Sequence, residues 1–247
     1  MSRIAIVTDI HANREALTAV LADVERRRAE RLVILGDVVG YGPDPEWCCD
    51  TVRGLVAKGA LIVQGNHDAA LSQPDTSMNI TARRAIEWTR PRLSPDQLAF
   101  LAGLPLKATL GDLLFVHASA HDAADWIYVT SAQRAMPSFR VSEARVIFCG
   151  HVHKPQLYSH DLNGRVQEQR IQAGQAFPLI RSRRWLAVVG SCGQPRDGRP
   201  LAAWALYDTV TNELAFHRVP YDTAATVARL RAGGLPESLA MRLLSGA

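Results

Sequence analysis

The stretch Ala60-Leu61-Ile62-Val63-Gln64-Gly65-Asn66-His67-Asp68 contains the pattern from which the fold of this chain can be predicted. Its apolar first half is typical of a buried strand. Gly65 then allows a tight exit from the strand, and three polar side chains follow at once. By itself the stretch is weak evidence of a site, because Asn and Asp are common turn residues. Its meaning comes from other apolar runs that end in the same way.

The first part of the chain alternates predicted strands and helices. Such alternation is typical of a parallel sheet with right-handed crossovers. We therefore predict an α/β protein. The expected strands cover residues 4–7, 31–35 and 60–64, and the expected helices cover residues 14–28, with Asn13 as N-cap, and 44–57.

The rest of the chain is predicted to hold a helical segment, then hairpins, then helices again. Ser94 and Gln97 have the spacing of a capping box, with Pro95 at the first helical position. Further helices are expected over residues 79–90, 131–139 and 223–245, the last split near Gly233-Gly234. Hairpins are expected over residues 106–117, turning at Gly111-Asp112, and 156–171, turning at Asn163-Gly164. A strand is expected over residues 145–149, and strands over 185–189, 201–207 and 213–219 are expected to continue the second hairpin.

Composition excludes several classes of protein. Of the 247 residues 47% are hydrophobic, which is typical of a globular protein. The net charge of +4 mildly favours anionic ligands, but no charged run requires nucleic acid. The four cysteines lack C-x-x-C spacing, so neither a disulfide framework nor a thiolate metal site is indicated.

The chain gives no sign of export or of division into domains. Its N-terminal apolar run is too short for a signal peptide, and no run reaches the roughly 18 apolar residues of a spanning helix. We therefore expect a cytoplasmic protein with free, buried thiols and no membrane partner. We expect one domain over residues 1–247, because no linker or repeat interrupts it.

Polar groups follow five of the predicted strands. In open α/β sheets, ligands gather at the carboxyl ends of strands. Each group has an ordinary structural explanation as a turn, a cap or a core histidine. However, five of the eight histidines fall at such ends, and this coincidence indicates a shared site. The groups are Asp9-x-His11, Gly36-Asp37, Gly65-Asn66-His67-Asp68, His117 and Gly150-His151-x-His153.

In type, order and approximate spacing these motifs resemble those of the calcineurin-like metallophosphoesterases. The resemblance covers residues 3–153 and extends more loosely to 190–195. It implies a four-layer α/β/β/α sandwich with two mixed sheets and a site for two divalent metal ions. At the matching positions it implies that Asp9, His11 and His153 hold the first ion, that Asn66, His117 and His151 hold the second, and that Asp37 bridges both.

The types of these residues agree with that chemistry. Imidazole and carboxylate ligands without thiolate suit Mn, Fe, Zn, Ni or Co. A hydroxide shared by two cations is a nucleophile at neutral pH. For His67 the resemblance implies contact with phosphate and protonation of the leaving oxygen, and the alternative is a histidine that only orients Asn66.

Two departures from the protein Ser/Thr phosphatases of this superfamily bear on the substrate. The Asp-Arg pair that follows their Gly-Asp motif is replaced here by Gly40 and Tyr41. The Glu and Arg that follow their Asn-His motif are replaced by Asp68 and Ala69. The arginine clamp for a phosphoprotein is therefore missing. The chain is more similar to the small bacterial phosphodiesterases and nucleotide hydrolases.

The leading prediction is a dinuclear metal-dependent phosphoesterase that hydrolyses small phosphodiesters or nucleotides by attack of a metal-bridging hydroxide. One alternative is a catalytically silent scaffold, although none of the expected ligands is missing. Another is a nuclease, which is disfavoured because the chain lacks a clear basic groove. Oligomeric state cannot be predicted from the sequence.

Several residues and loops keep two interpretations. The pocket wall is expected from loops over residues 40–45, 72–80, 119–130 and 175–184. Asn13 is either a simple cap or a pocket residue, Tyr41 covers either the pocket or the core, Asp68 orients a histidine or caps the next helix, and Arg196 contacts a substrate phosphate or lies on the surface.

Overall fold

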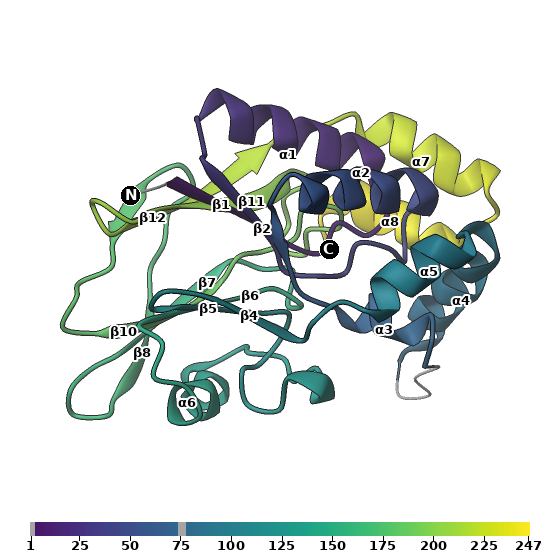
Figure 1. The fold of residues 1–247 in the computed structure, drawn as a ribbon. Coiled ribbons are helices and arrows are strands. Elements are labelled where there is room, and N and C mark those ends of the chain that lie inside the picture. The colour runs from purple at the N-terminus through teal and green to yellow at the C-terminus, as the bar shows by residue number, and fades with distance from the viewer. Residues whose placement is uncertain (1–2, 74–77) are drawn as a thin grey trace.

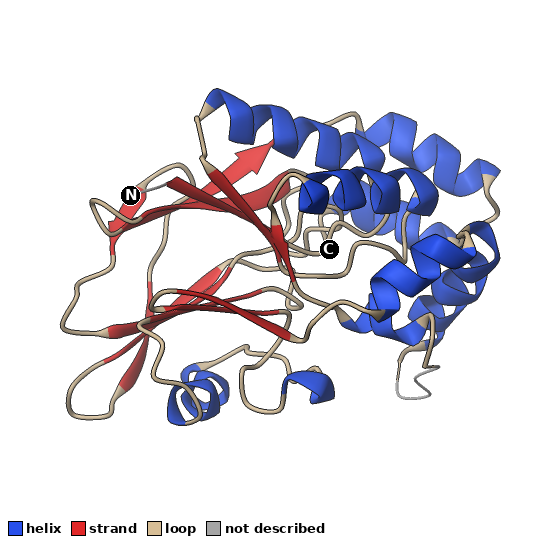
Figure 2. Cartoon of the chain, in the orientation of Figure 1, coloured by secondary structure: helices blue, strands red, loops and turns tan. Residues whose placement is uncertain are grey.

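Two β-sheets stack face to face between layers of helices in the computed structural model, which describes residues 3–73 and 78–247 (Figure 1). Within these residues each sheet has six strands. The space between the sheets is filled by apolar side chains such as Phe115, Phe148 and Trp185. Helices cover the outer face of each sheet, as Figure 2 shows. The predicted four-layer α/β/β/α sandwich with two mixed sheets is confirmed.

The first sheet combines parallel strands from the start of the chain with antiparallel strands from its end. Ile6 of the first strand pairs in parallel with Val33 and antiparallel with Ala205. The strand order is β3-β2-β1-β11-β12-β9. The bounds are β1 (Arg3–Val7), β2 (Arg31–Ile34), β3 (Leu61–Ile62), β9 (Ala176–Pro178), β11 (Ala202–Asp208) and β12 (Glu213–Val219).

The second sheet has three parallel central strands, with one antiparallel strand on one side and an antiparallel hairpin of two strands on the other. Both predicted hairpins are present in it. The strand order is β4-β5-β6-β10-β7-β8. The bounds are β4 (Lys107–Leu110), β5 (Leu113–Val116), β6 (Val146–Cys149), β7 (Gln156–His160), β8 (Val166–Gln169) and β10 (Arg184–Val188).

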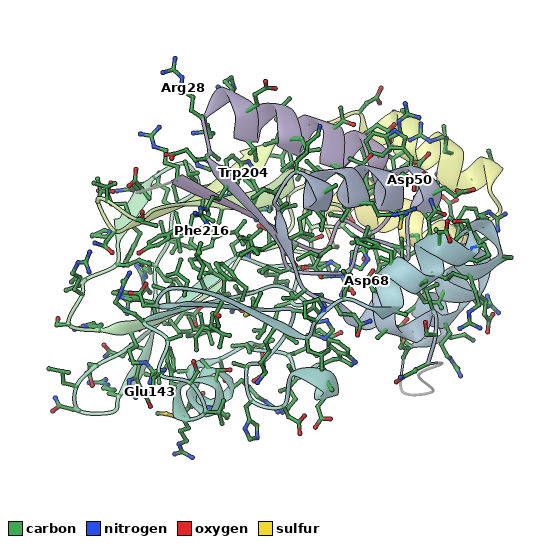
Figure 3. The ribbon with its side chains drawn as sticks, in the orientation of Figure 1. Arg28, Asp50, Asp68, Glu143, Trp204 and Phe216 are labelled. Carbon is green, nitrogen blue, oxygen red and sulfur yellow. The ribbon has the colours of Figure 1, made fainter. Side chains whose placement is uncertain are left out.

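Most helices lie over the first sheet or beside its end, whereas the helix over residues 132–140 lies over the second sheet (Figure 1). Trp204 lies beneath the first helix, whereas Phe216 packs between the sheets (Figure 3). Phe139 packs against the outer face of the second sheet. The helices are α1 (Arg14–Arg26), α2 (Pro45–Ala57), α3 (Asn66–Ala70), α4 (Ile80–Thr89), α5 (Pro95–Ala102), α6 (Ala132–Arg140), α7 (Thr223–Ala232) and α8 (Glu237–Ser245), with 3-10 turns η1 (Arg90–Arg92) and η2 (Ala123–Asp125).

Helix caps were predictable from local sequence alone. The Asn13 side chain accepts a hydrogen bond from the backbone N–H of Ala16 at the start of α1. Ser94 and Gln97 form the expected capping box at the start of α5.

The four cysteines are free and buried. Among the described residues, no helix combines the length and apolar character needed to cross a membrane.

The prediction that strands 201–207 and 213–219 continue the second hairpin was wrong. Both strands return to the first sheet as β11 and β12. The reason is that β1 is buried on both faces, and such a strand needs a partner on each edge. Strand β10 pairs in parallel with β6 as well as antiparallel with β7. The short strand β9 was not predicted.

The expected third strand is much shorter than the apolar run that suggested it. Its ladder with β2 covers only Leu61 and Ile62. The N–H of Val63 still donates to the carbonyl of Ile34 at the end of β2, but the N–H of Gln64 donates to the carbonyl of Pro105 instead. The chain then enters the short helix α3 at Asn66, so Asn66, His67 and Asp68 form the first turn of a helix.

Candidate metal centre

The seven predicted metal ligands lie together at the carboxyl ends of the central strands. All of them are buried, and Asn66 is the most exposed at 9%. Residues far apart in the sequence therefore meet at one edge of the two sheets. Asp9 and His11 follow β1, Asp37 follows β2, Asn66 begins α3 after β3, His117 follows β5, and His151 and His153 follow β6.

Asp9, His11 and His153 form a first group of converging ligand atoms. The Nδ1 atoms of His11 and His153 lie 3.2 Å and 2.5 Å from the carbonyl oxygens of Val39 and Gln194. A carbonyl oxygen only accepts hydrogen bonds, so Nδ1 of each ring carries the proton and Nε2 offers a lone pair.

These lone pairs face one another without a donor between them. The two Nε2 atoms are 3.1 Å apart, and Asp9 Oδ1 lies 3.2 Å from Nε2 of His153. Asp9 Oδ1 has no hydrogen-bond partner in the described structure. A buried cluster of three acceptors is unfavourable by itself, whereas a cation at its centre would satisfy all three.

Asp37, His117, His151 and Asn66 form a second group beside the first. His117 Nδ1 is 2.7 Å from the carbonyl of Leu35, so its Nε2 is also a free acceptor. This Nε2 lies 3.1 Å from Asn66 Oδ1 and 3.1 Å from His151 Nδ1. It lies 3.4 Å from Asp37 Oδ2. All four residues expected at the second ion therefore lie close to one another.

Asp37 stands between the two groups. Its Oδ2 lies 3.6 Å from His11 Nε2 in the first group as well as 3.4 Å from His117 Nε2 in the second. Its Oδ1 accepts a hydrogen bond of 2.8 Å from the backbone N–H of His67. One carboxylate oxygen therefore faces both groups, which is the geometry a bridging ligand needs.

The backbone at the centre adopts unusual conformations. Asp9, Asp37 and His151 have φ angles of 53°, 52° and 64°, and His11 and His153 share this left-handed region. Residues other than glycine seldom adopt it, and they persist there only where surrounding contacts hold them. Five of the seven predicted ligands are therefore strained, a property that no sequence pattern revealed.

Glycines allow the strands to end this close together. Gly65 has φ −100°, an extended conformation that other residues also adopt, so backbone freedom does not explain this glycine. Its role is instead to permit close approach, since a Cβ atom there would lie 2.1 Å from Asp37 Oδ1. A Cβ atom at Gly150 would lie 2.6 Å from Asp9 Oδ2.

Burial and neighbouring charges set the protonation of the centre. Burial lowers the pKa of the imidazoles of His11, His67, His117, His151 and His153, which favours the neutral form that metals bind. Burial alone would raise the pKa of Asp9, but the adjacent His153 holds it well below its usual value. Burial and the charge of Asp9 raise the pKa of Asp37.

Asp68 fixes the position of Asp37. Its Oδ2 accepts hydrogen bonds of 2.9 Å and 3.0 Å from the N–H groups of Asp37 and Gly65, and its Oδ1 accepts one of 3.0 Å from Val38. Burial raises the pKa of Asp68 to about 7, against the effect of these donors. Of its two interpretations the structure supports the cap of α3, and it adds a tie to the loop after β2.

His67 lies beside the ligands on α3. Its ring centroid is 4.4 Å from that of Tyr41 and 4.9 Å from that of His11. Its Nδ1 is buried and has no hydrogen-bond partner among the described residues, and it packs against Gly40, where a Cβ atom would approach it to 2.3 Å. Nε2 is therefore the ring nitrogen left to act in the cavity.

A cavity of about 540 Å³ opens over the centre. Its lining includes His67 and four of the seven predicted ligands, whereas Asp9, His11 and His117 are not among the described residues that line it. Such a volume is ordinary for a small-molecule site. The other lining residues are Tyr41, Met78, Asn79, Ala82, Asp125, Trp126, Ile127, Tyr128, Thr130, Arg134 and Arg196.

The loops predicted to form the wall differ in their contribution. Loops 40–45 and 119–130 line the cavity, whereas loop 175–184 does not. Met78 and Asn79 line it from loop 72–80, of which residues 74–77 lie outside the described residues. The aromatic residues of loop 119–130 were not predicted as site residues, because nothing in their spacing links them to the ligands.

The positions of Asn13, Arg196 and Tyr41 bear on the two interpretations that each of them had. The Asn13 amide nitrogen donates a 2.8 Å hydrogen bond to the carbonyl of Gly193, so Asn13 is a cap and a structural tie that does not line the cavity over the centre. Arg196 lines that cavity, donates a 2.8 Å hydrogen bond to Gln194 Oε1, and lies 5.6 Å from the ring centroid of Tyr41. Tyr41 is 5% exposed and belongs both to the cavity and to the core of the helices.

Comparison with known proteins gives consistent matches over the region that carries the centre. A family model for the calcineurin-like phosphoesterase superfamily domain matches residues 2–212. A protein of Methanocaldococcus jannaschii whose name states no function is 32% identical over 254 residues. The match covers 99% of this chain and 98% of that protein.

Two solved structures are similar over almost their whole length. A metallophosphoesterase from Sphaerobacter thermophilus has a TM-score of 0.88 and 37% identity, with 99% of this chain and 100% of that chain covered. A protein from Pyrococcus horikoshii OT3 has a TM-score of 0.79 and 20% identity, with coverage of 100% and 99%. At 20% identity, the similarity to the Pyrococcus horikoshii protein shows a common fold alone.

Proposed function

Because the chain belongs to the calcineurin-like phosphoesterase superfamily, we propose that it is a metal-dependent hydrolase of small phosphodiesters or nucleotides. The observation that carries this proposal is the convergence of two buried ligand groups on Asp37 beneath an open cavity. A silent scaffold would have no need to keep five of the seven expected ligands in strained backbone conformations.

The donor set fits two divalent cations. Asp9, His11 and His153 would hold one, Asn66, His117 and His151 would hold the other, and Asp37 would contact both. The unpaired acceptor atoms described above support this assignment, and nitrogen and oxygen donors suit Mn, Fe, Zn, Ni or Co. When bound, such ions supply positive charge toward phosphoryl oxygens and activate water at neutral pH.

His67 is proposed as the general acid. Its Nε2 would donate a proton to the leaving oxygen, since Nδ1 faces Gly40. Burial lowers the pKa of His67 in the free protein. An anionic phosphoryl group in contact with the ring would favour the protonated form that an acid needs.

Arg196 is proposed to bind a non-bridging phosphoryl oxygen. It lines the cavity, and its backbone N–H donates a 3.1 Å hydrogen bond to the carbonyl of His153. Its guanidinium is held by Gln194. The arginine clamp of the protein phosphatases is missing from the matching positions 40–41 and 68–69, which supports a small diester over a phosphoprotein.

A metal-reconstituted substrate panel tests the proposal. The apoprotein is loaded with Mn²⁺, Ni²⁺ or Fe²⁺ and given p-nitrophenyl phosphate, bis-p-nitrophenyl phosphate, cyclic nucleotides and dinucleoside polyphosphates. Metal-dependent turnover that is stronger for diesters than for p-nitrophenyl phosphate is expected. No turnover with any metal would favour the scaffold instead.

We also keep two broader predictions. The chain is proposed to form one domain over residues 1–247, because strands from both its start and its end build the first sheet. A cytoplasmic location is proposed on the ground that its four cysteines are free and buried.

A further inference from the structure

Trp126 and Tyr128, called here the aromatic wall, line the cavity beside the second ligand group. The Tyr128 ring stacks on His151 with centroids 4.0 Å apart and an angle of 27°. The Trp126 ring meets His117 edge to face at 5.8 Å. Two aromatic rings are therefore held against two imidazoles of the proposed second metal site.

The loop that carries the aromatic wall is held in a strained conformation. Trp126 has φ 51° and Asp122 has φ 52°, one on each side of the 3-10 turn η2. Positive φ is rare for a bulky residue, and strain of this kind persists only where surrounding contacts hold it. The strain here fixes the direction in which Trp126 leaves the backbone.

Core packing does not explain why the aromatic wall faces the cavity. Val129 and Ala123 anchor the loop in the core and are 1% and 5% exposed. Tyr128, next to Val129, is 50% exposed although its ring is stacked on His151. A residue that served only the core would be buried as Val129 is. An exposed, oriented ring suits a planar ligand.

We infer that the aromatic wall binds the base of a nucleoside whose phosphoester lies over the ligand groups. Bases stack on aromatic side chains with little dependence on base identity. The same cavity is lined by Met78 and Ala82, which offer apolar contact, and by Thr130, whose hydroxyl could bond the edge of a base. The inference rests on the proposed function and narrows its substrates to nucleoside phosphoesters.

Calorimetry with two probes tests the inference. Adenosine 5′-monophosphate and ribose 5-phosphate share the phosphate and the sugar, and only the first carries a base. They are titrated into metal-loaded protein in a His67→Ala background, so that hydrolysis does not disturb binding. Adenosine 5′-monophosphate is expected to bind about tenfold more tightly or better.

Variants of the aromatic wall assign this preference to its residues. Trp126→Ala and Tyr128→Ala are each expected to weaken adenosine 5′-monophosphate by about 5- to 100-fold and to leave ribose 5-phosphate unchanged. Tyr128→Phe keeps the ring and should keep the affinity. Leu162→Ala, a matched loss of apolar surface at a 90% exposed position in the hairpin turn, should change neither probe.

The outcomes separate this inference from the proposed function. Equal affinity for the two probes, or variants that weaken both probes equally, would overturn the inference even if the enzyme hydrolyses phosphoesters. Base-dependent binding that needs the aromatic wall would support it even if the substrate panel gave no turnover. Should Trp126→Ala fail to fold, the comparison of Tyr128→Ala with Tyr128→Phe tests the inference alone. Only the loss of the ring should then weaken the binding of adenosine 5′-monophosphate.

Discussion

Gly65→Ala tests whether the position of Asp37 controls the whole centre. Gly65 has φ −100°, which alanine adopts without strain, so the backbone gives no reason for an effect. The added Cβ atom, however, would lie 2.1 Å from Asp37 Oδ1 and 2.2 Å from the backbone nitrogen of Asp37. The effect must therefore act through Asp37.

The size of the effect follows from these distances. Ordinary contact begins at 3.4 Å, so Asp37 or the start of α3 must move by about 1.3 Å. Displacement of a positioned group by about 1 Å costs roughly 10²-fold in rate. Overpacking of this kind also costs about 1–3 kcal/mol of stability, which lowers the melting temperature by about 2–4 °C for each kcal/mol in a domain of this size.

Metal content and turnover are measured together. Gly65→Ala should hold fewer than two equivalents of metal by mass spectrometry and should lose about 10²-fold in kcat. Gly54→Ala is the matched control, because a Cβ atom at Gly54 within α2 would have no described atom within 4 Å. It should keep metal and activity and gain up to about 1 kcal/mol in stability. A Gly65→Ala protein with full metal content and wild-type kcat would refute the reasoning.

Four other predictions concern single residues: His67 and Asp68 at the centre, Arg196 in the cavity, and His217 on β12. His67→Ala should keep its metal and lose about 10²- to 10⁴-fold in rate, most for poor leaving groups; an unchanged rate would remove His67 as the acid. Asp68→Ala leaves the N–H groups of Asp37, Val38 and Gly65 without their acceptor. At about 1–3 kcal/mol for each buried group, urea unfolding should register a loss of at least about 3 kcal/mol; a loss below 1 kcal/mol would contradict this role. Arg196→Ala should raise KM by about 10- to 100-fold with a smaller change in kcat, as expected for a charged hydrogen bond to substrate; an unchanged KM would place Arg196 outside the substrate contacts. Burial lowers the pKa of His217 from its usual 6.5 to about 4, so the folded state binds this proton less readily than the unfolded state, and stability present above pH 6.5 is lost as the pH falls toward 4. Between pH 7 and pH 5 the wild type should lose about 1–2 kcal/mol more of its free energy of unfolding than His217→Phe loses. Urea unfolding of both proteins at the two pH values measures this difference.

Local sequence carried the information for the elements and for the order of the ligands. Apolar runs identified β1 and β2, and capping side chains such as Asn13 and Ser94 identified helix starts. These features depend on residues a few positions apart. The ligands could be assembled from sequence because parallel strands present their carboxyl ends at one edge of a sheet.

The remaining features depend on contacts between distant segments. The return of β11 and β12 to the first sheet depends on the free edge of β1, which no local pattern encodes. The tie between Asp68 and Asp37 spans 31 residues. The orientation of Trp126 and Tyr128 depends on their packing against His117 and His151, so the spacing of the two aromatic residues alone could not reveal it.

The ligand groups draw their members from both sheets. Asp9 and His11 follow a strand of the first sheet, while His117, His151 and His153 follow strands of the second. A cation in either group would therefore join the sheets at one end, as a cross-link does, in addition to any role in hydrolysis. Removal of the metal should then free that edge first, and amide hydrogen exchange should rise at the ends of β1 and β6 while the opposite edge of the sandwich keeps its protection.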